Sequence, residues 1–314
     1  MEEALYSQFG FFNTDLVRSA KKGDFLTSPE VSIYFGKILR NWINNSCNLN
    51  KIVEIGSGTG SLIEQIGIKE ITAIELSSTA REELINKGIM THTNVNELTL
   101  EKSELVFGNE ILDNIPCSIG IYRDKVWYEK VVAIQENSFS YDIKPIRNEE
   151  LDWINKNNIV PNEDHELEIQ VNIDKFLNTV IKKISPKNIL LFDYGYEQAN
   201  REKRKYNSLL RTYKNHHLSV DPIEDPGNID ITYDVNFSSL SRELKTLGYD
   251  VTLKLQRNFL LENGFDIIFD ELQEKYLVAE GMEKLKINSE LNGLKAIVDS
   301  NGLGGFYCLN AQKL

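Results

Sequence analysis

Three glycines and two acidic residues of this 314-residue chain have types and spacing that suit cofactor binding. They lie in and after two successive short apolar runs. The segment from Val53 to Gly60 reads V-E-I-G-S-G-T-G, a predicted strand that leads directly into G-x-G-x-G and then a predicted helix. Glycines suit such a turn because the backbone must bend tightly and approach a cofactor with no Cβ in the way. Glu75 ends the next apolar run, fifteen residues after Gly60, where a carboxylate can accept both ribose hydroxyls. These features predict a nucleoside cofactor.

The glycine spacing narrows the choice of cofactor. A dinucleotide fingerprint would read G-x-G-x-x-G, with a pyrophosphate at the helix N-terminus. Here the spacing is shorter, Glu54 precedes the first glycine, and Glu75 ends the next strand. The pattern favours S-adenosyl-L-methionine (SAM). Two alternatives stay open: a tight strand-to-helix turn that binds no ligand and, least favoured, an NAD-dependent oxidoreductase.

Composition excludes several classes of protein. Asp and Glu number 47 against 35 Lys and Arg, a net charge of −12 that makes nucleic acid an unfavourable partner. No apolar run approaches the ~20 residues that a spanning helix needs, so we expect no membrane insertion. The three cysteines are far apart and form no C-x-x-C pair, which argues against a disulfide framework or a zinc ribbon. Met1 to Tyr6 lack a basic-then-apolar pattern, so the expected localisation is cytoplasmic.

Apolar runs that alternate with helical periodicity predict an α/β fold with a doubly wound parallel sheet. The predicted strands are 52–55, 71–75, 105–108, 189–193, 248–253 and 306–309, and the predicted helices are 61–66, 78–86 and 173–184. Residues 118–146 and 194–237 do not fit this alternation. The first stretch, rich in β-branched and aromatic residues, predicts an antiparallel hairpin or meander.

We interpret both stretches as insertions, at about 117–165 and 196–240. They would interrupt a methyltransferase domain over 51–314, and residues 1–50 would form an N-terminal helical lid. No internal repeat or low-complexity tract is present.

Motifs along nearly the whole chain resemble those of one family. They are GDFLTSPEVS at 23–32, the glycine loop at 53–60, IELS at 74–77, NEILDNIP at 109–116, FDYGY at 192–196, and further blocks between 211 and 306. In this order they resemble the MidA-like family of SAM-dependent methyltransferases, which includes the mitochondrial complex I assembly methyltransferase. The resemblance implies a class I methyltransferase fold, Rossmann-like with β-rich and helical insertions, and protein arginine methylation. Ser57 stands where the family usually has a proline, and the chain is short for the family.

Methyl transfer from a sulfonium is an in-line displacement that chiefly requires alignment and desolvation. An arginine acceptor would also require carboxylates to hold its guanidinium, which stays charged. Glu110 and Asp113 follow the fourth predicted strand of the sheet and are the candidate catalytic carboxylates. Asn109 suits the amino-acid part of the cofactor or the acceptor. The alternative is that Asn109 and Glu110 cap a helix that Pro116 ends.

His216 is the third candidate catalytic residue, as a proton acceptor. A structural hydrogen bond within the region of Arg211, Tyr213 and Asp230 is an equally good interpretation. His92 and His165 lie in segments unrelated to His216 and His217, and no metal-ligand spacing connects them, so we expect no metal site.

The motif at 23–32 predicts a lid in which Asp24 or Thr27 bonds near the cofactor. The alternative is a helix start in which Ser28 is the N-cap and Pro29 the first helical residue. The complete set of candidate cofactor-binding residues is Gly23, Asp24, Thr27, Glu54, Gly56, Gly58, Gly60, Glu75, Leu76, Asn109 and Glu110.

The leading hypothesis is a SAM-dependent protein arginine N-methyltransferase with a protein substrate, which the resemblance extends to a respiratory complex I subunit. The alternatives are a small-molecule methyltransferase and a non-catalytic SAM-binding assembly factor. The basic segment 201–214 predicts either a docking surface for an acidic partner or a solvated face. The oligomeric state, monomer or homodimer, stays open.

Overall fold

A computed structural model describes residues 1–13, 27–48, 50–99, 102–136, 138–203, 209–214, 217–218 and 221–314. The chain divides into two compact units. The sheet unit comprises Asp15–Ile111, Val180–Tyr194 and Gly248–Leu314, and the β-rich unit comprises Met1–Thr14, Leu112–Thr179 and Gly195–Leu247. The lid and domain boundaries expected from the sequence stay a prediction.

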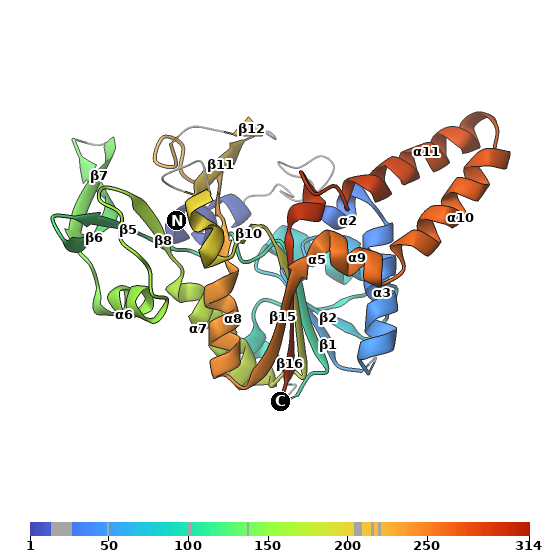
Figure 1. Ribbon diagram of the computed structural model, residues 1–314, viewed down its shortest axis with the longest axis horizontal. Helices are drawn as coiled ribbons and strands as arrows, with labels where there is room; N and C mark the ends of the chain where they lie inside the picture. Colours follow the sequence, from blue (N-terminus) through green and yellow to red (C-terminus); the bar gives the residue numbers. More distant parts are fainter. Residues whose placement is uncertain are drawn as a thin grey trace. The chain divides into compact units, whose positions relative to one another are not determined.

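The sheet unit is built on seven strands (Figure 1). In spatial order they are β15 (Tyr249–Leu255), β16 (Tyr307–Lys313), β9 (Asn188–Asp193), β4 (Leu105–Asn109), β1 (Ile52–Ile55), β2 (Ile71–Ile74) and β3 (Met90–His92). Neighbouring strands are parallel except that β16 runs antiparallel to both β9 and β15. The predicted doubly wound α/β sheet and its six strands are confirmed. The short strand β3 was not predicted, because its residues are at least partly exposed and form no apolar run.

The central strands explain the sequence pattern and locate the site. Every residue of β1, β4 and β9 is buried, as expected for parallel strands covered on both faces. The chain continues from β1 outward to β2 and β3, then returns to place β4 on the other side of β1. In open α/β sheets, ligands bind at the carboxyl ends of the strands where this order reverses. The residues that follow β1 and β4 therefore lie at the expected binding edge.

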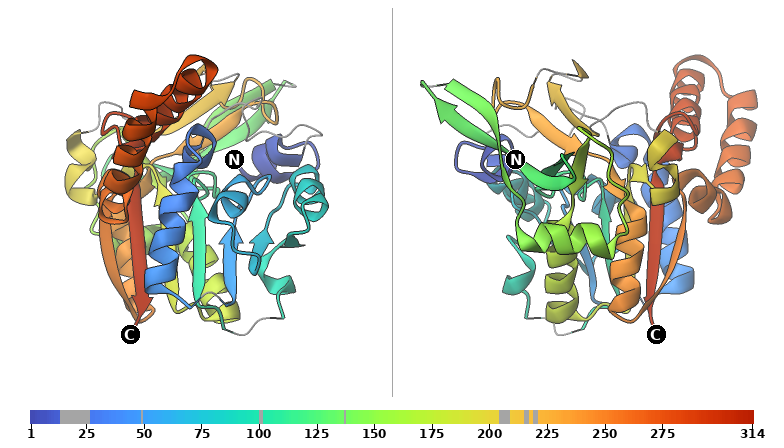
Figure 2. Two further views of the ribbon diagram at one scale, coloured as in Figure 1. Left: turned by 90° about the vertical axis from the view of Figure 1, so that its right-hand side faces the viewer. Right: turned by 60° about the vertical axis from the view of Figure 1, so that its left-hand side comes forward.

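Helices cover the sheet and extend from it. In the sheet unit they are α2 (Ser28–Val31), α3 (Tyr34–Ser46), α4 (Ser61–Ile66), α5 (Ser78–Asn86), α9 (Gln256–Glu262), α10 (Phe265–Val278) and α11 (Gly281–Ala296), with the short turns η2 (Val95–Glu97) and η4 (Leu303–Gly305). α3 lies across one face of the sheet, where the Phe35 ring packs edge-on against Phe192 of β9 (Figure 2). The helical hairpin of α10 and α11, which the sequence analysis did not predict, extends away from α9 (Figure 1).

The β-rich unit contains three small sheets. Its elements are α1 (Glu2–Tyr6), η1 (Phe11–Asn13), β5 (Ser118–Arg123), β6 (Val126–Gln135), β7 (Ser138–Pro145), α6 (Asn148–Lys156), β8 (Glu166–Ile169), α7 (Val171–Ile184, as far as Thr179), β10 (Gly195–Tyr196), η3 (Gln198–Lys203), β11 (Leu210–Lys214), β12 (His217–Leu218), β13 (Asp230–Tyr233), β14 (Val235–Asn236) and α8 (Phe237–Thr246). The strands β7, β6, β5 and β8 form one antiparallel sheet, which confirms the predicted meander. None of the helices in the described ranges has the length and apolar character needed to cross a bilayer.

Candidate cofactor and catalytic site

The glycine loop after β1 requires glycine for two reasons. Gly56, Gly58 and Gly60 have φ angles of 69°, 51° and 85°, in the left-handed region that side chains disfavour. A Cβ added to Gly56 would lie only 2.3 Å from Cγ2 of Ile111. Both the backbone conformation and the lack of space therefore explain why this turn is made of glycines.

Ile111, which the sequence analysis missed, fills the space that two glycines leave. A Cβ added to Gly108 in β4 would lie 2.7 Å from Cδ1 of Ile111, beside the close approach to Gly56. The Ile111 side chain thus packs the segment after β4 against the loop after β1. Gly108 was a possible signal, because a glycine inside a strand often marks such an approach.

Glu75, directly after β2, is tied to the glycine loop by its carboxylate. Oε2 accepts a hydrogen bond from the Gly58 backbone N–H at 2.8 Å, and Oε1 accepts one from the Ser77 N–H at 2.8 Å. Burial raises the pKa of Glu75, while these two hydrogen bonds oppose the rise. A carboxylate oxygen has more than one lone pair, so both oxygens can still accept hydroxyl donors. The neighbouring Leu76 side chain is exposed.

Two buried oxygens at this edge of the sheet have no hydrogen-bond partner among the residues that the structure describes. They are Oε2 of Glu54, in β1, and Oδ1 of Asn109, the last residue of β4. Glu54 is 3% exposed, and its pKa is raised well above 4.5, chiefly by burial and further by the charge of Glu75. Because unsatisfied buried acceptors are costly, these atoms fit a ligand that brings hydrogen-bond donors.

Glu110 is held in a left-handed conformation, with φ 55°, and it caps a helix. Its backbone N–H donates to the carbonyl of Phe192 in β9 at 2.8 Å. Its Oε1 accepts hydrogen bonds from the Ser28 N–H at 3.1 Å and from Nδ2 of Asn109 at 3.0 Å. Residues 110–116 contain bends and one short turn but no helix, so the alternative of a helix starting there is wrong. Glu110 does cap a helix, but the helix that it caps is α2, through the Ser28 N–H.

The start of α2 also corrects the expected cap. The N-cap residue is Thr27, not Ser28, and Glu30 completes a capping box with it. The Thr27 N–H donates to Oε2 of Glu30 at 3.1 Å. Thr27, a candidate cofactor-binding residue, therefore bonds within its own turn.

Two further side chains, both missed by the sequence analysis, fix α2 to the sheet unit. Nε2 of the fully buried Gln256 donates to Oγ of Ser28 at 3.1 Å and to the Ile297 carbonyl at 3.0 Å. Nε2 of Gln65, in α4, donates to the Pro29 carbonyl at 2.6 Å. Together with Glu110, these glutamines join α2 to segments far apart in the sequence.

Asp113 belongs to the β-rich unit and is 4% exposed. Its carbonyl accepts a hydrogen bond from the Tyr233 N–H at 3.2 Å. The pKa of Tyr213 is raised, first by burial and then by the charges of Asp234, Asp113 and Asp230, although Arg211 lowers it. Asp113 is thus close to the charged groups of β11 and β13.

The basic segment 201–214 uses two of its arginines inside the β-rich unit. Arg201 lies 3.6 Å from Oε2 of the fully buried Glu168, and Arg211 forms an ion pair with the buried Asp234. These two arginines therefore do not belong to a simple solvated face. Because they already pair with buried acids, they are also not available to an acidic partner. Gly23, Asp24 and His216 lie outside the described residues, so their proposed roles stay predictions.

Comparison with known proteins decides the family. Residues 36–253 match the family described as "Putative S-adenosyl-L-methionine-dependent methyltransferase". The chain belongs to this family. It is a SAM-dependent methyltransferase, its cofactor is SAM, and the orphan acceptors of Glu54 and Asn109 fit the amino group and hydroxyls of that molecule. The expected cofactor and activity are confirmed.

Curated relatives confirm the resemblance to the MidA-like family. The Caenorhabditis elegans protein named "Protein arginine methyltransferase NDUFAF7 homolog, mitochondrial" is 24% identical over 83% of this chain and 70% of its own length. The Rattus norvegicus protein of the corresponding name is 25% identical over 81% of this chain and 67% of its own. Both are named as mitochondrial proteins, so the expectation of a cytoplasmic protein is wrong.

A solved structure from Burkholderia thailandensis, bound to S-adenosyl-homocysteine, superposes with a TM-score of 0.85. It is 22% identical to this chain, and the superposition covers 99% of this chain and 86% of that one. A second, native structure from the same organism gives a TM-score of 0.82 at 22% identity, over 99% and 85% of the two chains. These similarities confirm the class I methyltransferase fold.

Proposed function

We propose that this enzyme transfers the methyl group of SAM to a side-chain nitrogen of arginine in a protein. The observation that carries the proposal is the likeness to relatives named as protein arginine methyltransferases, along 83% of this chain for the nematode protein. The resemblance to complex I assembly methyltransferases extends the proposal to a subunit of respiratory complex I as the acceptor.

The residues at the carboxyl ends of β1, β2 and β4 would hold SAM, which supplies the methyl group. The glycine loop would let the backbone approach it, because Gly56, Gly58 and Gly60 carry no Cβ. The orphan oxygens of Glu54 and Asn109 would accept hydrogen bonds from its donor groups. Glu75 already fixes the loop through Gly58 and would accept the ribose hydroxyls.

Glu110 would align the acceptor. A guanidinium is held best by a carboxylate whose position is fixed in advance, and Glu110 is fixed through Ser28 and Asn109. Methylation of a guanidinium nitrogen releases one proton, which a nearby base must take. Asp113 and His216 are the proposed candidates for that base, along with Glu110 itself.

The test compares methylated residues across the proteome in wild-type cells and in cells lacking this gene. We expect a methylarginine on a respiratory-complex subunit to be lost, and to return when purified enzyme and labelled SAM are added. Enzyme carrying Glu110→Gln keeps an acceptor oxygen for the Ser28 N–H but loses the charge, so it should bind SAM and transfer methyl groups about 100-fold more slowly.

Two results would reject the proposal. If no protein changes its methylation while SAM binding is intact, the acceptor is a small molecule or the protein acts without catalysis. If Glu110→Gln restores the cellular function fully without methyl transfer, the assembly-factor reading replaces the enzymatic one.

A further inference from the structure

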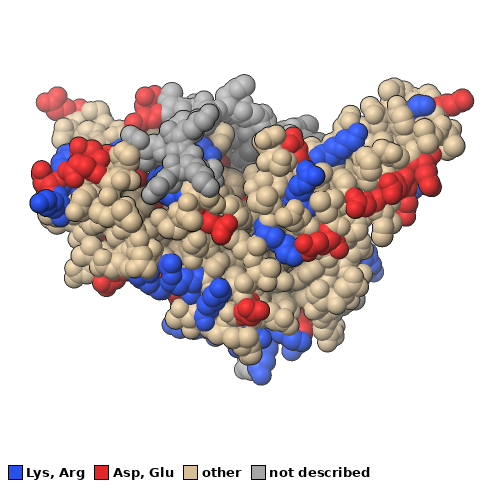
Figure 3. Space-filling view, viewed as in Figure 1, with Lys and Arg blue, Asp and Glu red and all other residues tan. Residues whose placement is uncertain are grey.

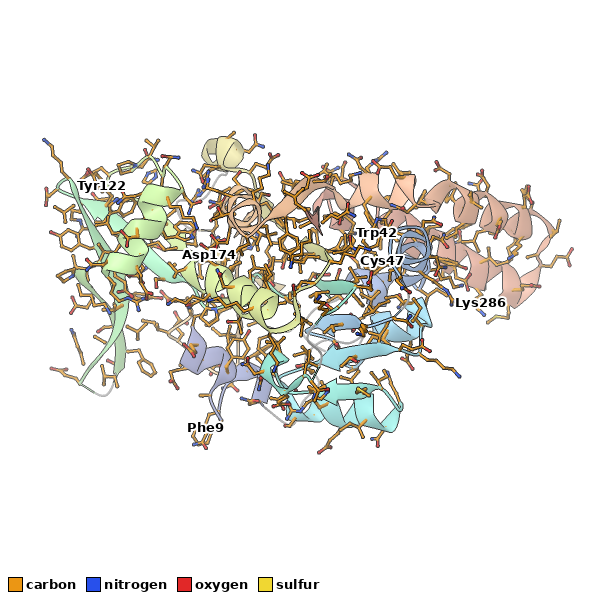
Figure 4. All side chains as sticks on the ribbon, turned by 90° about the horizontal axis from the view of Figure 1, so that it is seen from below. Phe9, Trp42, Cys47, Tyr122, Asp174 and Lys286 are labelled. Atoms are coloured by element: carbon orange, nitrogen blue, oxygen red, sulfur yellow. The ribbon has the colours of Figure 1, made fainter. Side chains whose placement is uncertain are left out.

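The turn between α10 and α11 exposes an apolar patch. Leu277 is 77% exposed, Val278 83%, Met282 81% and Leu285 64%. These four side chains fall within nine residues at the end of a hairpin that extends from α9 (Figure 1). Figure 4 labels Lys286 beside this end of α11, away from Trp42 of α3. Scattered exposed apolar residues are ordinary, but a local concentration of them marks an interaction site.

An acidic stripe leads along α10 to this patch. Asp266, Asp270 and Glu274 recur every four residues, so they lie on one face of the helix, and Val278 continues the series. All three acids are exposed, and none forms an ion pair with any residue in the described part of the chain. The space-filling view shows acidic side chains gathered along this hairpin (Figure 3). Like charges at this spacing destabilise an isolated helix, so a partner that brings basic side chains would relieve their repulsion.

The base of the hairpin is firmly attached next to α2. A Cβ added to Gly293 of α11 would lie 2.6 Å from the Val31 carbonyl oxygen, so the two backbones are in close contact. Gln256 bonds both the Ile297 carbonyl, just after α11, and Oγ of Ser28. Glu110 caps that same residue, Ser28. A partner bound to the hairpin is therefore connected through packed elements to the edge of the cofactor site.

We propose that the α10–α11 hairpin is the docking arm for the methyl-accepting protein, and that it binds a basic segment carrying apolar side chains. The exposed tip would bury the apolar side chains, and the acidic stripe would pair with the basic ones. A second copy of this chain fits poorly, because it has a net charge of −12 and presents the same acidic stripe. The inference rests on the proposed function, which requires a protein acceptor.

The first test measures binding of a fluorescent amphipathic peptide with arginines on one helical face and leucines on the other. The full-length protein carrying Asp266→Lys, Asp270→Lys and Glu274→Lys should bind it at least about tenfold more weakly, and the neutral Asn and Gln versions should be intermediate. Replacing Leu277, Val278 and Met282 by serine should also weaken binding. SAM affinity and helical content should not change in any variant.

The matched control reverses three exposed acids elsewhere in the sheet unit, Glu70→Lys, Glu82→Lys and Asp250→Lys, with the same change in net charge. Binding to this control should stay within about twofold of the wild type. Equal losses in the two sets would show nonspecific attraction and overturn the proposal. Sedimentation that shows wild-type self-association, lost in the α10 variants, would also overturn it, by identifying a second copy as the occupant.

The peptide assay is independent of methyl transfer, so the two proposals can fail separately. Arm-specific binding in an enzyme that methylates no arginine would reject the proposed function alone. Methylation of extract proteins that is unchanged in the α10 and tip variants would reject the docking arm alone.

Discussion

At the scale of single residues, the buried acid of β1 is expected to lower the stability of the ligand-free protein. Glu54 occupies a strand position that is otherwise apolar, between Val53 and Ile55, and its Oε2 has no partner among the described residues. Burial raises its pKa well above 4.5. The folded protein therefore holds the Glu54 proton more tightly than the unfolded chain does, and stability falls as pH rises above about 4.5.

Glu54→Gln should remove the loss of stability that the buried carboxyl causes, and it should also weaken the proposed contact with SAM. Without SAM, we expect the variant to be more stable than wild type by about 1–3 kcal/mol near neutral pH and equally stable at low pH. Its SAM affinity should fall about tenfold. Urea unfolding across pH and SAM titration measure the two effects. An unchanged dependence of stability on pH would show that Glu54 is not the titrating group.

Site residues that belong to one continuous motif could be predicted from the sequence, whereas those defined by contacts between distant segments could not. Gly56, Gly58, Gly60 and Glu75 belong to a continuous pattern, so their arrangement could be expected from spacing. Ile111 could not, because its role depends on its contact with Gly56, which lies in the loop after β1 and is distant in sequence. The roles of Glu110 in catalysis and of Glu54 in cofactor binding stay predictions.

At the scale of elements, α2 is too short to be stable by itself and depends on side chains from elsewhere. A helix of four residues forms too few internal hydrogen bonds to offset its nucleation. Glu110, directly after β4, Gln65 of α4 and Gln256 of α9 supply the missing partners. Such partners are distant in sequence, so local patterns could not predict them; the cap itself is local, because Thr27 pairs with Glu30 three residues later.

Gln256→Leu should loosen α2. Leucine has a similar size but leaves the buried Ile297 carbonyl and Ser28 hydroxyl without this donor, so we expect a loss of about 1–3 kcal/mol in unfolding free energy. Cleavage by added protease near Thr27 should become faster. The exposed Gln273→Leu is the control, expected within about 0.5 kcal/mol of wild type. Equal stability of the two variants would contradict the anchoring role.

Some helices and strands could be predicted from the sequence, and others could not. The buried strands β1, β4 and β9 were expected because burial on both faces produces continuous apolar runs. The helices α10 and α11 were not, because few of their residues are buried and their apolar positions follow no clear helical period.

At the scale of the whole molecule, a titrating group within the β-rich unit affects stability near neutral pH. Asp174 of α7 (Figure 4) has its pKa raised to about 7, first by burial and then by the charge of Glu243 in α8. Lys156, whose Nζ lies 3.9 Å from Oδ2 of Asp174, offsets part of this rise. Because the pKa of Asp174 is higher in the folded protein than its ordinary value of 3.8, folding favours the protonated carboxyl. The stability that this preference contributes is lost as pH rises from about 4 to 7.

Asp174→Asn should therefore stabilise the protein at pH 8 by about 2 kcal/mol, a figure already reduced for solvent screening. Near pH 4 the variant and the wild type should be equally stable. Thermal unfolding at a series of pH values measures this difference. A variant that is less stable than wild type at high pH would show that the Asp174 carboxylate is net favourable when charged.

Protein arginine methylation is tested most directly by incubating purified enzyme with methyl-labelled SAM and proteins from cells lacking this gene. The products are then hydrolysed to amino acids. We expect the label in methylarginine, and its loss with Glu110→Gln despite intact SAM binding. Label in a different amino acid, or only in small molecules, would contradict protein arginine methylation. Failure of the wild-type protein to bind SAM would contradict the cofactor site itself.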